Sequence, residues 1–303
     1  MTTAKFITYE QGEAALDWIA LTDALAAGHA LPRAEIEDSF LYRRDDTLLS
    51  RAAWIDGLGS LVKTATIFPG NAAAGKPAVN GAVTLFSDRT GEAEAFVDFH
   101  LVTKWKTAGD SLLAARRLAR PESRNILILG AGTVAGTLIE AYGAAFSGAK
   151  FTLWNRTKAR AEALAEKTGA AVAEDLAEAV AAADIIATAT MSTEPVLKGE
   201  WLQPGQHIDL IGAYRPDMRE ADDAVLTRAR LFVDSRATTV GHIGELKDPL
   251  ARGVIGEGDI VADYYQLDAV RRESAEEITV AKNGGGAHLD LMTARHILDR
   301  VGA

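Results

Sequence analysis

The spacing of apolar residues divides the chain into two parts with different architectures. Residues 1–40 carry apolar positions at helical spacing up to a break at Gly28 and Pro32. From about Thr47 the period changes to two, which is typical of half-buried strands. The alternation predicts strands at 48–55, 61–68, 82–87 and 93–98. We therefore expect a small antiparallel sheet in the first part of the chain.

Fully apolar runs alternate with helical patterns beyond Pro121, after a helix that Thr103 is expected to cap. The predicted strands are 125–129, 151–154, 185–188, 207–211 and 231–234, and the predicted helices are 133–146, 158–167 and 175–182. This alternation predicts a Rossmann-type, doubly wound parallel sheet. A last helix at 290–301 follows Gly284-Gly-Gly286 and is expected to return to the first part.

The predicted fold class is α/β, with a Rossmann-type domain and a smaller α+β domain that contains the antiparallel sheet. A length of 303 residues is enough for two domains. We expect residues 1–118 and 284–303 to form the smaller domain, and 119–283 to form the Rossmann-type domain.

The composition excludes several classes of function. Forty-two acidic and 32 basic residues give a net charge of -10, which repels phosphate backbones and anionic lipids, so neither nucleic acid nor membrane is an expected partner. The absence of cysteine excludes disulfides, thiolate nucleophiles and iron-sulfur clusters. The six histidines show no metal-ligand spacing, so we expect no metal. Without a signal sequence or an apolar run of ~20 residues, we expect a soluble, cytoplasmic protein.

A glycine-rich turn follows the first apolar strand of the Rossmann-type part. In Gly130-Ala131-Gly132-Thr133-Val134-Ala135, the first glycine allows the tight turn and the second lets the backbone approach a pyrophosphate. The helix that begins here would direct its N-terminus at the anion. The alternative is a strand-to-helix turn without a ligand, which the surrounding pattern disfavours.

The next strand ends without the acid that usually binds the ribose hydroxyls of NAD. Instead it carries Asn155, Arg156, Thr157 and Lys158. A guanidinium can hold a 2′-phosphate, so NADP(H) is the expected cofactor and NAD(H) the alternative. The other interpretation is that the two cations are solvated residues at a helix start. Further cofactor contacts are expected where later strands end, at Thr188, Ala189, Thr190, Gly212 and Ala213.

Three cations in the first part form a candidate anion site. Lys63 and Arg51 each share a strand face with apolar residues, so each needs an anionic partner unless it points outward at a sheet edge. Lys106 is expected in the first helical turn after Thr103, where the helix dipole disfavours a cation. A bound carboxylate would explain all three.

The chain resembles the ornithine cyclodeaminase and mu-crystallin family over roughly residues 40 to 300. The stretches that carry the resemblance are 62–71, 106–108, 128–132, 154–158, 194–195, 199–205 and 211–223. In cyclodeaminases the turn after the fifth strand carries an aspartate, whereas this chain has Tyr214. Asn155-Arg156-Thr157 and the run after Tyr214 resemble the ketimine reductases. Most of the family has arginine at the position of Lys106.

The resemblance implies reduction of a cyclic ketimine 2-carboxylate, such as Δ1-pyrroline-2-carboxylate to L-proline or Δ1-piperideine-2-carboxylate to L-pipecolate. It makes Lys63 the candidate proton donor, with Arg51, Lys63 and Lys106 as carboxylate ligands. It also implies that the smaller domain binds substrate and pairs two copies into a homodimer. The alternatives are an ammonia lyase of the cyclodeaminase type with tightly bound NAD, and a non-catalytic protein that binds NADP and a small ligand.

Overall fold

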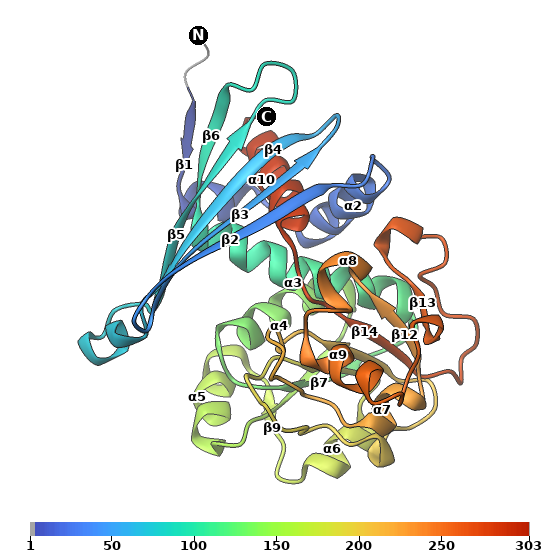
Figure 1. Ribbon diagram of the computed structural model, residues 1–303. Coiled ribbons are helices and arrows are strands. Elements are labelled where there is room, and N and C mark those ends of the chain that lie inside the picture. The colour runs from blue at the N-terminus through green and yellow to red at the C-terminus, as the bar shows by residue number, and fades with distance from the viewer. Residues whose placement is uncertain (1–3, 303) are drawn as a thin grey trace. The chain divides into compact units, whose positions relative to one another are not determined.

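The computed structural model describes residues 4–302 and divides into two compact units (Figure 1). Unit 1 consists of residues 4–106 and 286–302, and unit 2 of residues 107–285. The first division falls inside helix α3 (Phe99–Leu118). Residues 1–3 and 303, which we assigned to the smaller domain, lie outside the described residues.

Unit 1 contains a six-stranded sheet with the order β1-β6-β5-β4-β3-β2. All neighbouring strands are antiparallel except β1 and β6, which are parallel. The strands are β1 (Lys5–Ile7), β2 (Glu35–Arg43), β3 (Asp46–Ile55), β4 (Gly59–Ile67), β5 (Val79–Phe86) and β6 (Ala93–Asp98). The four predicted strands are confirmed as β3 to β6.

The prediction that residues 1–40 are helical was wrong at both ends of that segment. Residues 5–7 form β1 and residues 35–40 begin β2, whereas only α1 (Tyr9–Ala15) and α2 (Trp18–His29) are helical. β2 is an edge strand whose side chains are mostly exposed and mix charged with apolar residues, so it lacks a helical or strand-like apolar period. Its hydrogen-bonded pairing with β3 decides its conformation.

Helix α10 (Ala287–Gly302) packs against β2 to β5 and against α1 and α2 (Figure 1). The approach of α10 to α2 is close, because a Cβ at Gly28 would lie 2.6 Å from the Met292 sulfur. Only glycine fits there without a shift. The last helix thus forms part of the core of unit 1, and its buried face includes Leu289, Leu291 and Ile297.

Unit 2 contains an eight-stranded sheet with the order β13-β12-β14-β11-β10-β7-β8-β9, and every pair in it is parallel. The strands are β7 (Asn125–Leu129), β8 (Lys150–Trp154), β9 (Ala171–Val172), β10 (Ile185–Thr188), β11 (His207–Leu210), β12 (Arg230–Val233), β13 (Ile260–Ala262) and β14 (Thr279–Lys282). The five predicted strands and the Rossmann-type topology are confirmed. β14 was missed because it is short and ends in a lysine, yet it lies between β11 and β12.

The helices of unit 2 are α4 (Thr133–Ala145), α5 (Lys158–Thr168), α6 (Leu176–Ala182), α7 (Asp223–Thr227), α8 (Arg236–Thr239) and α9 (Gly244–Ala251). Single turns of 3-10 helix occur at η2 (Gly199–Trp201), η3 (Glu257–Asp259) and η4 (Tyr264–Gln266), and unit 1 has η1 (Pro69–Ala74). None of the helices in residues 4–302 combines the length and apolarity needed to cross a bilayer.

The strand order of unit 2 reverses at β7. From this strand the chain runs to β8 and β9 on one side and then to β10 and β11 on the other. Loops that leave neighbouring strands in opposite directions open a crevice at the carboxyl ends of those strands. This topological switch point therefore lies beside Gly130, which follows β7 directly.

Candidate active site

Lys63 of β4 points into unit 1 and is only 6% exposed. Its Nζ donates hydrogen bonds to Asp290 Oδ1 at 2.8 Å and to Thr103 Oγ1 at 2.9 Å. The ammonium also lies 4.8 Å from the centre of the Phe99 ring. The interpretation of Lys63 as an outward-facing edge lysine is therefore wrong, and the required anionic partner is Asp290.

Arg51 lies directly opposite Lys63 on β3. One guanidinium nitrogen donates to Asp38 Oδ2 at 2.7 Å, and another is 3.9 Å from Asp290 Oδ2. Burial works to lower the pKa of Arg51, but Asp290 and Asp38 outweigh it and raise the pKa. Arg51 therefore remains a cation and shares Asp290 with Lys63.

Asp290 is fully buried, and α10 begins three residues before it. The last helix was predicted from residue 290, whereas α10 begins at Ala287, so Asp290 lies in its first turn. Burial favours a raised pKa for Asp290, but the charges of Lys63, Lys106 and Arg51 hold the pKa below its usual value. The only signal in the sequence was an acid within an apolar stretch.

Lys106 occupies a different part of α3 than predicted. The helix begins at Phe99, and Asp98 Oδ1 accepts the Leu101 N–H at 2.8 Å. Thr103 is therefore not the N-cap; its hydroxyl donates to the Phe99 carbonyl at 2.8 Å. Lys106 lies beyond the first turn, where the dipole argument does not apply. After burial, the charge of Lys106 is among the causes that shift the pKa of Lys63 and of Asp290, so Lys106 acts electrostatically on both groups.

The cation cluster of Lys63, Arg51 and Lys106 has an unbalanced charge. Burial lowers the pKa of Lys63, and the nearby Asp290 opposes this effect. Lys63 and Arg51 are paired with Asp290 and Asp38, whereas the Lys106 ammonium has no hydrogen bond or ion pair among the described residues. Three cations facing two carboxylates leave one positive charge, which suits a small monoanion such as a carboxylate.

The switch point of unit 2 holds a second candidate site. The N-terminus of α4 has no side-chain cap, and Gly130 has a φ of +120°. A Cβ at Gly130 would lie 2.5 Å from the Ala189 carbonyl oxygen, whereas a Cβ at Gly132 would meet only open space. The backbone therefore leaves room and free N–H groups for an anion at a helix N-terminus, which fits a dinucleotide pyrophosphate.

A pocket of about 440 Å³ opens in front of this turn. Eight of the predicted cofactor residues line it: Gly130, Ala131, Gly132, Asn155, Arg156, Thr157, Ala189 and Thr190. The other six, Thr133, Val134, Lys158, Thr188, Gly212 and Ala213, do not line it. We call it the dinucleotide pocket.

The two predicted cations at the start of α5 differ in their surroundings. Lys158 donates to Glu174 at 2.5 Å and lies 3.8 Å from Glu162, so acidic side chains already neutralise it. Arg156 lines the dinucleotide pocket without an ion-pair partner among the described residues, and so does Arg160. We missed Arg160, which lies in the first turn of α5, whereas Arg156 precedes that helix.

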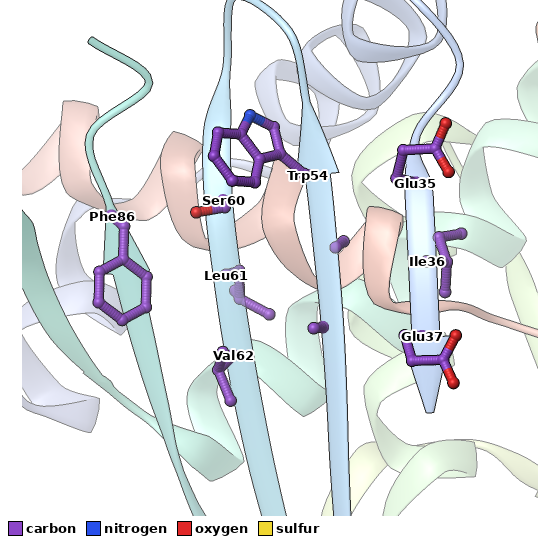
Figure 2. Close-up of a pocket in the computed structure, with 10 residues that line it drawn as sticks. Glu35, Ile36, Glu37, Trp54, Ser60, Leu61, Val62 and Phe86 are labelled. Carbon is purple, nitrogen blue, oxygen red and sulfur yellow. The ribbon is translucent and has the colours of Figure 1, made fainter. Parts of the chain in front are cut away.

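A further hollow of about 370 Å³ lies on the unit 1 sheet, and its lining residues do not include the three cations of the cluster. Figure 2 shows Trp54, Val62 and Phe86 on three of its strands, with Glu35 on β2 at its rim. Within residues 4–302, no group of three or more His, Asp or Glu side chains is placed to hold a metal ion.

Comparison with known proteins supports the resemblance. The chain is 50% identical over 302 residues to the Delta(1)-pyrroline-2-carboxylate reductase of Paracoccus denitrificans, which covers 97% of this chain and 96% of the relative. It is 35% identical over 240 residues to the ketimine reductase mu-crystallin of Mus musculus, covering 78% and 74% of the two chains.

Solved structures share the fold over nearly the full length. The Thermococcus litoralis Delta(1)-pyrroline-2-carboxylate reductase in complex with NADH and L-proline superimposes with a TM-score of 0.87 at 25% identity, covering 98% of this chain and 97% of that chain. An archaeal alanine dehydrogenase dimer with bound NAD gives a TM-score of 0.88 at 28% identity, covering 98% and 95%.

The family model described as "Ornithine cyclodeaminase/mu-crystallin family" matches residues 56–303. This match spans most of the chain and agrees with the resemblance seen in the sequence. The chain belongs to the ornithine cyclodeaminase/mu-crystallin family.

Proposed function

We propose that this protein reduces a cyclic ketimine 2-carboxylate with a nicotinamide cofactor, converting Δ1-pyrroline-2-carboxylate to L-proline. The observation that carries the proposal is the uncompensated positive charge of the cation cluster, in a chain that also has a dinucleotide pocket. The 50% identical relative is a reductase of this imine, and the structural relative binds NADH and L-proline. Δ1-Piperideine-2-carboxylate, with one more methylene, is the second expected substrate.

Lys106 and Arg51 are proposed to bind the substrate carboxylate. Lys106 has no partner among the described residues. One guanidinium nitrogen of Arg51 donates to Asp38, whereas another is 3.9 Å from Asp290, beyond hydrogen-bond distance. A carboxylate between them would restore charge balance. Arginine can supply the two-donor geometry that a lysine cannot offer.

Lys63 is proposed to hold the proton that the imine nitrogen needs. A protonated imine accepts hydride far better than a neutral one, and a bound reduced nicotinamide supplies that hydride. Burial lowers the pKa of Lys63, so its ammonium gives up a proton more readily than an exposed lysine. Asp290 and Thr103 fix the direction of the ammonium through their two hydrogen bonds.

NADP(H) is the proposed cofactor, with NAD(H) accepted more weakly. Arg156 and Arg160 line the dinucleotide pocket, and Thr157 adds a hydroxyl. Such a group of donors suits a 2′-phosphate. Glu174 is engaged with Lys158.

An absorbance assay distinguishes this proposal from a cyclodeaminase. We expect NADPH oxidation at 340 nm with Δ1-pyrroline-2-carboxylate and with Δ1-piperideine-2-carboxylate, and no ammonia from ornithine plus NAD. Tyr214, 56% exposed, replaces the aspartate that the cyclodeaminases carry. Ammonia release without imine reduction would contradict the proposal, and cofactor binding without either reaction would favour the non-catalytic alternative.

We also propose that two copies pair through the face of the unit 1 sheet opposite α10. This face exposes Leu48, Trp54, Val62 and Phe96, although large apolar side chains usually avoid water. The structural relative described as a dimer has the same fold.

A further inference from the structure

Glu220 is a fully buried carboxylate beneath the strand ends of unit 2. Its Oε1 accepts hydrogen bonds from the backbone N–H and the hydroxyl of Thr190, both at 2.7 Å. Its Oε2 accepts the N–H of Gly212 at 2.7 Å and that of Ala213 at 3.1 Å. One side chain therefore binds four donors in two loops.

These two loops follow neighbouring strands. Thr190 comes after β10 and lines the dinucleotide pocket, whereas Gly212 comes after β11. The packing is tight, because a Cβ at Gly212 would lie 2.4 Å from Glu220 Oε1 and 2.2 Å from the Thr190 carbonyl oxygen. The carboxylate fixes the spacing between the loops, and only glycine at position 212 leaves room for it.

A second layer of buried charge fixes Glu220 itself. Glu245, also fully buried, accepts the N–H of Glu220 at 2.7 Å and that of Ala221 at 3.1 Å. Lys282 of β14 donates to the carbonyls of Leu210 and Ala213 at 2.8 and 2.7 Å. The loop after β11 is thus held from both sides, by a carboxylate on its N–H groups and by an ammonium on its carbonyls.

Burying this much charge is costly, and packing alone does not require it. Burial raises the pKa of Glu245 to about 7, and the charge of Glu220 adds to the effect. Buried charge of this kind fixes groups in one arrangement, at the expense of stability. In open α/β sheets the ligand lies at these strand ends, so the fixed groups are those nearest the cofactor.

We propose that Glu220 is a positioning residue for the reduction: it holds Thr190 and Gly212-Ala213 so that the loops after β10 and β11 present a fixed surface to the nicotinamide half of the cofactor. The inference rests on the proposed nicotinamide-dependent function. It leaves the pyrophosphate to Gly130-Ala131-Gly132 and the adenosine to Arg156, none of which is among the donors that hydrogen-bond to the Glu220 carboxylate. Loss of the Glu220 carboxylate should therefore weaken binding of the nicotinamide half of the cofactor and leave binding of the other half unchanged.

The test compares two ligands in Glu220→Gln. The glutamine keeps one acceptor and turns an NH₂ group toward backbone N–H donors. We expect NADPH to bind at least 10-fold more weakly, whereas 2′-phospho-ADP-ribose, which lacks nicotinamide, binds within 2-fold of wild type. We expect kcat for imine reduction to fall at least 10-fold, with the KM for the imine unchanged. Glu166→Gln, an exposed change on α5, is the matched control.

Thr190→Val is the second variant, should Glu220→Gln fail to fold. It removes only the hydroxyl donor, and we expect the same selective loss at a smaller size, about 3-fold. Equal weakening of both ligands, or an unchanged kcat, would overturn the positioning role. If the wild type reduces no imine, the proposed function fails, but the comparison of the two ligands still decides the role of Glu220.

Discussion

At the scale of single residues, Lys63 and Lys106 differ in what holds them. Lys63 forms a buried ion pair with Asp290, whereas Lys106 has no partner among the described side chains. Removing one member of a buried pair leaves the other charge uncompensated. The two lysines should therefore respond differently to truncation.

We expect Lys106→Ala to lower kcat/KM for the imine by an amount that corresponds to roughly 2 to 5 kcal/mol of transition-state binding, with little change in thermal stability.

Lys63→Ala should lower kcat/KM at least as much. It should also cost about 3 to 5 kcal/mol of folding free energy, because Asp290 stays buried without its ion-pair partner. Steady-state kinetics and urea denaturation measure both effects, with the exposed Lys150→Ala as control. Unchanged kcat/KM in both variants would refute the carboxylate site.

Arg156 and Lys158 provide a matched pair for cofactor preference. Arg156→Ala should reduce the ratio of kcat/KM for NADPH to that for NADH about 10-fold or more, because a charge-assisted contact to the 2′-phosphate is lost. Lys158→Ala should change this ratio less, since Lys158 is already paired with Glu174. An equal loss with both cofactors in Arg156→Ala would contradict the assignment.

At the scale of elements, the sheet of unit 1 has one face covered by α10 and one that exposes large apolar side chains. Trp54 on β3 lies directly opposite Ser60 on β4 and Glu35 on β2. These positions share the uncovered face, because side chains opposite each other point to the same side. The hollow in Figure 2 lies among these strands.

We expect Trp54→Glu to convert a dimer into a monomer, because it would place a charge at the centre of an apolar interface. Light scattering after size-exclusion chromatography gives the mass of each form. A charge added on an exposed helix, Ala163→Glu on α5, is the control and should leave the mass unchanged. A wild type that elutes as a monomer would rule out this interface.

At the scale of the whole molecule, buried acids make stability depend on pH. Burial raises the pKa of Glu245 to about 7, whereas an unfolded glutamate titrates near 4.3. Between these values the folded chain keeps a proton that the unfolded chain has lost, so this group makes stability fall as pH rises, by up to about 1.4 kcal/mol per pH unit. Burial lowers the pKa of His207 to about 3, which has the opposite effect below pH 6.5.

The contribution of Glu245 to the free energy of unfolding is therefore measured as the difference between Glu245→Gln and wild type. We expect Glu245→Gln to gain stability relative to wild type as pH rises from about 5 to 7, and the difference to level off above 7. Chemical denaturation at pH 5, 6, 7 and 8 gives the values. A difference that is constant with pH would mean that Glu245 titrates normally in the folded protein.

The sequence by itself determined the order of the elements in unit 2 and the glycine turn after β7, because period, apolar runs and glycines are local signals. It also singled out Lys63 and Arg51 as cations that interrupt an apolar face, but left open whether they are buried or point outward at a sheet edge. The helix that carries Lys106 was placed five residues too late, because Asp98 and Thr103 are both good capping residues and only the structure shows which one caps.

The tertiary structure alone decided which charges meet. Asp290 lies 227 residues from Lys63 along the chain, and no local pattern links them. Glu220 lies within the stretch 211–223 that carries the family resemblance, where nothing local marks it as buried. Lys282 lies on β14, a strand too short to show a period. Long-range pairs of this kind arise when helices and strands pack, since burial then forces each charge to find a partner. The composition of the candidate site follows from that packing.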